Sequence, residues 1–279
     1  MAEKHPIHDY TKDGDIILKV ENTHFLVHKP ILSLASKFFN DLFTLATPNS
    51  NEIIKNTTVN ESEGSIHILE IVEDVTSFQD MLSFIYPNTI LHINWKNVEN
   101  LLRIADKFVI NKLSDACDFF LQNNVVDNVL TSFILADQYR LPIPFKESSK
   151  LILNDYFKYE IDSKFIRISK ETREKLEDSC YFFHTALNKI HFYFSNDDDV
   201  YNNYYFSNAV QKVCVYPAPN PSVVYSVFSS IKFCYSHLKD QKLEAAKVFV
   251  NRFKDYLSKF EKFKKGRSNN FYPFIELED

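Results

Sequence analysis

The chain has 279 residues, of which 45% are hydrophobic and 25% are charged, and its formal net charge is −5. This length allows one large domain or two ordinary ones, and the apolar fraction is sufficient to build their cores. The mild net charge excludes a general preference of the whole chain for strongly acidic or basic partners.

Glycine is rare: Gly14, Gly64 and Gly266 are the only three in the sequence. Phosphate-binding loops, dinucleotide fingerprints and nucleophile elbows need several closely spaced glycines, which let the backbone approach a ligand or adopt positive φ. Three large enzyme classes therefore lack their usual signature. We expect no enzymatic activity, no catalytic residue and no cofactor.

The cysteines are far apart and show neither C-x-x-C nor paired spacing, which argues against a zinc cluster or a disulfide framework. They are Cys117, Cys180, Cys214 and Cys234. Residues 1–14 lack the apolar run of a signal peptide, and no stretch is long and apolar enough for a membrane helix. A cytoplasmic or nuclear location, in a reducing compartment, is the expectation.

Two β-prone runs, residues 15–20 and 23–28, are separated by the polar pair Glu21-Asn22, which predicts a hairpin. Pro30 follows at a position that the first turn of a helix tolerates. An apolar stripe at helical spacing then predicts a buried helical face, with a break into two helices near Ser36 left open. The stripe consists of Ile31, Leu34, Ala35, Phe38, Phe39, Leu42 and Phe43.

Residues 47–65 are polar and are predicted to form a long loop, after which residues 66–72 have strand character. Residues 76–79 match the T-x-x-Q capping box, which predicts a helix that ends at Pro87. A short β-prone piece, residues 90–93, comes next.

Helices are expected almost exclusively after residue 95, and the sequence begins to repeat itself there. The segment Ile-Ala-Asp-Lys-Phe at 104–108 is echoed by Leu-Ala-Asp-Gln-Tyr at 135–139, and each is predicted to end a helix just before a turn and a second helix. Such an echo indicates stacked helical pairs across residues 95–160. Further helical runs include a heptad-like seam in the last one, residues 243–260.

Two groups of side chains suggest metal ligands at first sight. His24 and His28 lie on the same side of a predicted strand, but no third ligand is apparent, and hydrogen bonding at the strand-to-helix junction explains them better. The acidic run at 197–199 is consecutive and lacks the glycine of a calcium loop, which favours a solvated loop. No metal site is expected.

Residues 241–267 contain nine Lys or Arg against three acidic residues, with Phe253, Phe260 and Phe263 interleaved. This basic stretch is the feature that suggests nucleic acid or an anionic membrane surface as a partner. Because the heptad places the Phe residues on a packing face, a solvated side of a terminal helix is the favoured interpretation. Nucleic acid is therefore not the expected partner.

Residues 15–124 resemble a BTB (POZ) domain through several motifs that occur in order: FLVHKPILSLAS, FFNDLF, FQDMLSFIYPN and LLRIADKFVINKLSDACDFF. In that family the first strand begins with Asp, here Asp15, and a His-Lys pair, here His28-Lys29, lies where strand meets helix. The segments NVLTSFILADQYRLP and FIRISKETREKLE resemble the start of a BACK-like helical extension. The implied fold class is α+β: a small sheet flanked by helices, followed by a mostly α-helical region.

The resemblance implies an N-terminal tail (1–14), the BTB/POZ domain (15–124) and a BACK-like extension (125–194). It fades beyond about residue 195, where local pattern alone predicts a helical C-terminal region with loops and a basic terminal helix (195–279). It also implies an interaction module without catalysis, which recruits a cullin scaffold of a ubiquitin ligase and presents an unidentified client protein. A homodimer is an open alternative, although a strand-exchanged dimer needs more sequence before the first strand than residues 1–14 provide. A transcriptional or nucleic-acid-associated regulator is the other function left open.

Cullin-binding members carry a hydrophobic-x-Glu motif near the helix at 76–86, where this chain has Phe78-Gln79-Asp80. The residues expected to shape the protein-binding surface are Phe39, Asp41, Leu42, Phe78, Asp80, Phe84 and Tyr86. Asp in place of Glu departs from the family motif and leaves cullin binding open.

Overall fold

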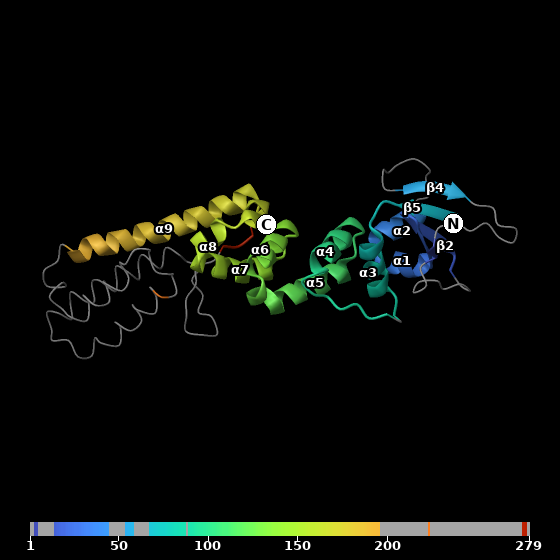
Figure 1. Cartoon of the computed structure of the whole chain (residues 1–279), viewed down its shortest axis with the longest axis horizontal. Helices are drawn as coiled ribbons and strands as arrows, with labels where there is room; N and C mark the ends of the chain where they lie inside the picture. The colour runs from blue at the N-terminus through green and yellow to red at the C-terminus, as the bar shows by residue number, and fades with distance from the viewer. Residues whose placement is uncertain are drawn as a thin grey trace. The chain divides into compact units, whose positions relative to one another are not determined.

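The structure is a computed structural model, which describes residues 3–4, 14–44, 54–58, 67–87, 89–195, 223 and 275–277. The chain divides into two compact units, Met1–Asn123 and Asn124–Asp279. The first unit holds the β-sheet with five helices, and the described part of the second is helical apart from its connections (Figure 1). The predicted fold class, a small sheet flanked by helices and followed by a mostly helical region, is confirmed.

The sheet of the first unit has five described strands in the order β1-β3-β2-β5-β4. Their bounds are β1 (Glu3–Lys4), β2 (Ile16–Val20), β3 (Thr23–Val27), β4 (Ile54–Thr58) and β5 (His67–Ile71). β2 and β3 pair antiparallel as the predicted hairpin, and β5 pairs parallel with β2. The hairpin and the strand at 66–72 are therefore confirmed.

Two edge strands were not expected from the sequence. β1 lies within the predicted N-terminal tail and pairs parallel with β3, and β4 lies within the predicted loop at 47–65 and pairs antiparallel with β5. Both escape an alternation search because β1 has two residues and β4, with the sequence IKNTT, is largely polar, as edge strands often are. Conversely, residues 90–93, which looked β-prone, form no strand.

Helices α1 (Lys29–Ala35), α2 (Lys37–Thr44) and α3 (Val75–Ile85) lie beside the sheet, and α4 (Val98–Lys107) and α5 (Asn111–Asn124) follow (Figure 1). The break at Ser36 is confirmed. The Ser36 hydroxyl donates to the carbonyl of Phe108 at 2.5 Å and accepts from the Phe39 N–H at 3.1 Å, so it begins α2 and ties it to the end of α4.

The capping box at 76–79 is wrong. The N-cap of α3 is Asp74, whose carboxylate accepts from the Ser77 N–H at 2.8 Å, so Thr76 lies inside the first turn. Asp74 offers the same capping chemistry two residues earlier, because a carboxylate suits the orphan N–H groups at a helix N-terminus.

An aromatic cluster forms the core beneath the sheet. The ring of Phe108 stacks on Phe39 with centroids 5.3 Å apart and meets Phe78 edge-on at 6.0 Å, and Phe78 contacts Phe25 of β3 at 5.3 Å. All four side chains are fully buried. Removing a ring of this kind from a core costs about 3–5 kcal/mol, so these residues fix how α2, α3 and α4 pack on the sheet.

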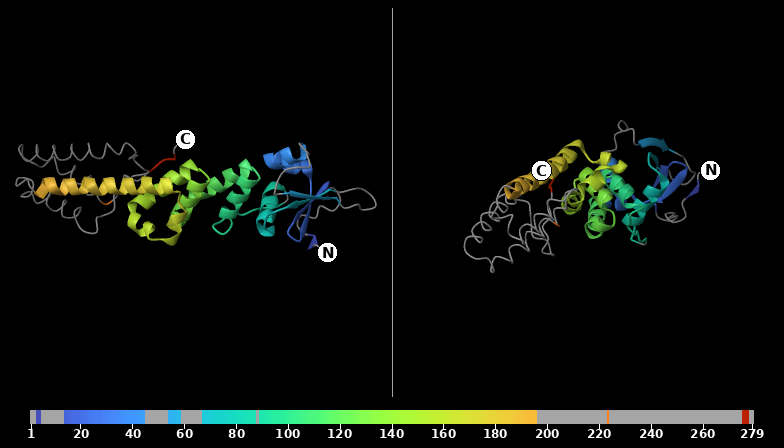
Figure 2. Two further views of the ribbon diagram at one scale, coloured as in Figure 1. Left: turned by 90° about the horizontal axis from the view of Figure 1, so that it is seen from above. Right: turned by 60° about the vertical axis from the view of Figure 1, so that its left-hand side comes forward.

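The described part of the second unit contains η1 (Val125–Asp127), α6 (Val129–Gln138), α7 (Pro142–Asn154), α8 (Tyr156–Glu160), η2 (Ser163–Arg167) and α9 (Lys170–Ser195), the long yellow-to-orange helix of Figure 2. Phe133 of α6 stacks on Phe145 of α7 at 4.8 Å. Asp137 of α6 accepts from the Ser169 N–H at 2.7 Å and from the Thr172 hydroxyl at 2.6 Å, which fixes the start of α9.

The sequence echo corresponds to two helix endings of one type. Two residues after the last residue of α4 and of α6 stands a residue of positive φ, Val109 at 51° and Arg140 at 52°. The following N–H groups reach back five residues, Ile110 to the Ala105 carbonyl at 2.8 Å and Leu141 to the Ala136 carbonyl at 2.9 Å. This is the Schellman hydrogen bond of helix C-termini, so the predicted helix endings are confirmed. Continuous stacking across 95–160 spans both units and stays a prediction.

Candidate protein-interaction surface

The junction of β3 and α1 is fixed by side chains from two distant segments. The carboxylate of Asp15, the residue just before β2, accepts from the Lys29 N–H at 2.7 Å and so caps the first turn of α1. The His28 N–H donates to the Tyr86 hydroxyl at 2.9 Å, and the His28 Nδ1 lies 3.3 Å from the same oxygen. The junction role predicted for His28 is confirmed, with Tyr86 rather than neighbouring backbone as partner.

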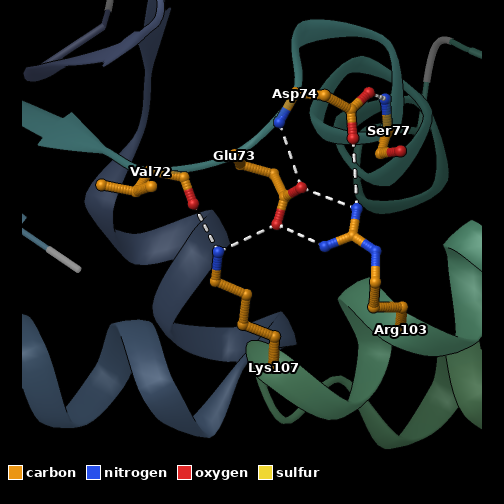
Figure 3. A network of polar contacts seen from close by, with 6 residues as sticks. All are labelled: Val72, Glu73, Asp74, Ser77, Arg103 and Lys107. Carbon is orange, nitrogen blue, oxygen red and sulfur yellow. Dashed lines mark hydrogen bonds and ion pairs between the residues drawn. The ribbon is translucent and has the colours of Figure 1, made fainter. Parts of the chain in front are cut away.

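An ion-pair network holds the end of β5 against α3 and α4 (Figure 3). The side chain of Glu73 is only 4% exposed and accepts from Arg103 Nη2 at 2.6 Å, from Arg103 Nη1 at 2.9 Å and from Lys107 Nζ at 2.9 Å. Arg103 also reaches the Asp74 carboxylate at 3.1 Å, and Lys107 donates to the carbonyl of Val72. Both cations come from α4, so this network connects α4 to the start of α3.

The two cations of this network change the pKa of Glu73. Burial alone would raise that pKa, but the hydrogen bonds from Arg103, Lys107 and the Asp74 N–H outweigh burial and lower it from 4.5 to about 2. Glu73 is therefore ionised at neutral pH, and its contacts stabilise the fold.

The seven residues predicted to form the protein-binding surface divide into two groups. Phe39, Phe78 and Tyr86 have buried side chains, at 0%, 0% and 2% exposure, and contribute to the core described above. Because they are buried, they can affect a binding surface only by holding its helices in place. Phe78, the hydrophobic position of the Phe78-Gln79-Asp80 motif, is therefore not exposed to a partner.

The other four predicted residues, Asp41, Leu42, Asp80 and Phe84, are half-buried. Asp41 and Leu42 belong to α2, whereas Asp80 and Phe84 are four residues apart on α3 and so share one face of that helix. Burial and the nearby Asp74 charge raise the pKa of Asp80, against a hydrogen bond from the Asn97 side chain. The binding role of these residues stays a proposal.

The loop before α4 supports Asp80 through Asn97. The Asn97 side chain donates to the His92 carbonyl at 3.0 Å and accepts from the Asn94 N–H at 2.8 Å. Asn94 in turn accepts from the Lys96 N–H at 2.9 Å. These hydrogen bonds fix the loop that carries Asn97, so the hydrogen-bond partner of the Asp80 carboxylate is held in place.

Exposed apolar side chains add surface that the sequence pattern did not predict. Leu34 is 92% exposed although it belongs to the stripe predicted to be buried, and Ile90 is 82% exposed. α1 and α2 are separate short helices, so a stripe drawn across both overstates the width of the buried face. In the second unit, Ile161 and Ile166 are both exposed, and Ile166 lines a hollow of about 430 Å³ together with residues that include Arg173 and Glu177.

Within the described residues, no group of three or more His, Cys, Asp or Glu side chains is arranged to hold a metal ion. Burial raises the pKa of the Cys117 thiol to about 12, and burial together with nearby acidic side chains raises that of Cys180 to about 11, which disfavours the reactive thiolate. No helix in this part of the chain has the length and apolarity needed to span a bilayer.

Several predictions concern residues outside those that the structure describes. They are the acidic run at 197–199, the basic stretch at 241–267, the heptad-like seam at 243–260, and Cys214 and Cys234. They stay predictions.

Comparison with known proteins gives a match to the BTB/POZ domain family over residues 7–125. BTB and MATH domain-containing protein 36 of Caenorhabditis elegans is 29% identical over 129 residues, or 46% of this chain and 35% of that protein. Human Kelch repeat and BTB domain-containing protein 4 is 26% identical over 130 residues, which are 46% of this chain and 22% of that protein. Kelch-like protein 25 of Xenopus tropicalis is 27% identical over 160 residues, which are 56% of this chain and 25% of that protein.

The chain thus matches no more than about a third of the length of these relatives. The predicted resemblance is confirmed for the first part of the chain, and the BACK-like character of 125–194 stays a prediction.

Proposed function

We propose that this chain, in which residues 7–125 form a BTB/POZ domain, is a non-enzymatic adaptor that docks a cullin scaffold and presents another protein to it. The domain match is the observation that carries the proposal. One matched relative is named for Kelch repeats and a BTB domain and another is named a Kelch-like protein, which supports a protein-interaction module.

The docking face that we assign to the cullin is the outward side of α3, defined here by Gln79, Asp80, Ser83 and Phe84, all half-buried. Phe84 supplies an apolar contact and Asp80 a carboxylate four residues earlier, which suits a partner with an apolar pocket beside a hydrogen-bond donor. The buried Phe78 and the Glu73 network hold α3 in place behind this face.

The family motif has Glu where this chain has Asp80, and the difference gives a direct test. Asp80→Glu extends the carboxylate by one methylene toward the partner, whereas Asp80→Asn removes the charge but keeps the size. We expect Asp80→Glu to strengthen cullin binding and Asp80→Asn to weaken it. Burial raises the pKa of Asp80, which means that the folded state disfavours its charged form. The uncharged Asn should therefore leave the fold intact.

The experiment is affinity capture from cells of the full chain and its variants, with mass spectrometry of the captured proteins. Phe84→Ala should remove cullin peptides, and Asp106→Lys, an exposed charge reversal on α4, is the matched control that should retain them. Phe78 is not substituted, because losing a buried ring would unfold the domain. Equal recovery with Phe84→Ala and the control would contradict the assigned face.

A further inference from the structure

The last described residues of the chain, 275–277, contact α7 of the second unit at a site built from three different interactions (the red segment in Figure 1). Ile275 is 6% exposed, so its side chain is buried although the segment has no regular secondary structure. Burying a large aliphatic side chain is favourable, so Ile275 helps to anchor this segment.

Ser149 binds the backbone of this segment. Its hydroxyl oxygen accepts from the Ile275 N–H at 3.1 Å and lies 3.3 Å from the Ile275 carbonyl oxygen. The same hydroxyl lies 2.8 Å from the Lys146 carbonyl, so its one hydrogen serves two acceptors. Ser149 is 0% exposed, and a hydroxyl at a buried position therefore recognises a main chain that does not belong to its own helix.

Lys146 recognises the next residue of the segment. Its Nζ lies 2.6 Å from the Glu276 carboxylate, and the two side chains are 24% and 46% exposed. Lys146 and Ser149 are three residues apart, so they lie on the same face of α7. α7 thus presents a backbone partner and a cation to a segment whose aliphatic side chain is buried, elements by which short peptide segments are recognised.

We infer that this face of α7 is a binding site for a peptide segment in which a large aliphatic residue is followed by an acidic one. Here the site is occupied in cis by Ile275 and Glu276. A client segment of the same chemistry competes with residues 275–277, which hold the site closed until such a segment is present. The inference deepens the client-recognition part of the proposed function, but the site does not require the cullin.

Competition in cis sets the size of the expected effect. A tethered segment has an effective concentration that reaches the millimolar range, so a free peptide of equal intrinsic affinity competes poorly. Ile275→Asp in the full chain places a charge at this buried position and is expected to release the segment. We therefore expect a free peptide to bind the released chain at least about tenfold more tightly than the unmodified chain.

The probe is a fluorescein-labelled peptide of sequence NFYPFIELED, residues 270–279, titrated by fluorescence anisotropy. It should bind full-length Ile275→Asp and bind the unmodified chain at least about tenfold more weakly. A peptide with Asp for Ile and Lys for Glu is the matched control and should bind neither. Adding Lys146→Glu to Ile275→Asp should weaken binding by about tenfold, with circular dichroism verifying that the helices remain.

Three results would overturn the inference. They are no peptide binding to Ile275→Asp, equal binding to the released and unmodified chains, or binding that Lys146→Glu leaves unchanged. A concentration-dependent dimer of the unmodified chain that Ile275→Asp abolishes would show that the segment binds a second copy, which contradicts occupation in cis. Cullin binding by Ile275→Asp should be unaffected, so failure here is distinguishable from failure of the adaptor proposal.

Discussion

Replacing Glu73 by Gln removes the negative charge at the centre of the network in Figure 3 while keeping the side-chain size. Arg103 and Lys107 then lose their common acceptor, and the amide turns donor hydrogens toward two cations. We expect the first unit to lose stability and α3 to be held less firmly against α4. The effect should exceed that of a surface ion pair because the Glu73 side chain is only 4% exposed.

The magnitude follows from the pKa of Glu73, which folding lowers from 4.5 to about 2. At about 1.4 kcal/mol per pH unit between the two values, the charged form stabilises the fold by about 3 kcal/mol at neutral pH. Arg103 is 42% exposed, so water recovers part of the loss and about 2–3 kcal/mol is expected for Glu73→Gln.

The sign of the pH dependence is fixed by the lowered pKa. A carboxylate with a folded-state pKa below its unfolded value stabilises the protein above the unfolded pKa, and this contribution disappears as pH falls toward the folded pKa. For Glu73 the window runs from 4.5 down to about 2. The difference in unfolding free energy between wild type and Glu73→Gln should therefore shrink to about 1 kcal/mol at pH 3.

Urea unfolding measured by tryptophan fluorescence provides the assay. Trp95 is the sole tryptophan of the chain and packs edge-on against Phe120 at 5.1 Å, so its signal reports on the first unit. Glu70→Gln is the matched control, because the Lys19–Glu70 pair is 3.3 Å long with both side chains 35% exposed and should contribute at most about 1 kcal/mol. Two results would refute this reasoning. One is an equal loss of unfolding free energy for the two substitutions at pH 7, and the other is a loss for Glu73→Gln that is as large at pH 3 as at pH 7.

Two further predictions use the same fluorescence assay. Ser36→Ala should destabilise the first unit by about 1–3 kcal/mol, because the Phe39 N–H and the Phe108 carbonyl each lose a buried partner; a loss below the measurement error would mean that water replaces the hydroxyl. Val109→Gly should stabilise the first unit by up to about 1 kcal/mol, since a β-branched residue is strained at φ 51° and glycine is not; Val109→Ala keeps most of the strain, so equal effects of the two changes would contradict this explanation.

The strands and helices with a clear hydrophobic period could be predicted from the sequence because period and element type are directly linked. The hairpin and the strand at 66–72 belong to this class, whereas the apolar stripe runs through Ser36 and leaves the break there open. β4 could not be predicted, since an edge strand with a polar sequence carries no alternation and its pairing with β5 depends on a distant segment.

The candidate surface could be predicted only in part, for a related reason. The family motif placed Phe78 in the binding site. Phe78, Met81 and Leu82 also recur at helical spacing, a pattern that indicates a buried face, and all three are buried in the structure. Contacts between distant residues have no local signal at all. Nothing in the spacing shows that Glu73 pairs with Arg103, 30 residues later, or that Ile275 reaches Ser149, 126 residues earlier.

The most direct test of the adaptor proposal is a calorimetric titration of the purified full chain with a purified cullin N-terminal domain, repeated with Asp80→Glu, Asp80→Asn and Asp106→Lys. The account predicts a dissociation constant at or below about 1 μM for the wild type, tighter binding for Asp80→Glu and at least about tenfold weaker binding for Asp80→Asn, with Asp106→Lys unchanged. No measurable heat of binding with any of the four proteins, or identical affinities for the Asp80 variants, would contradict it.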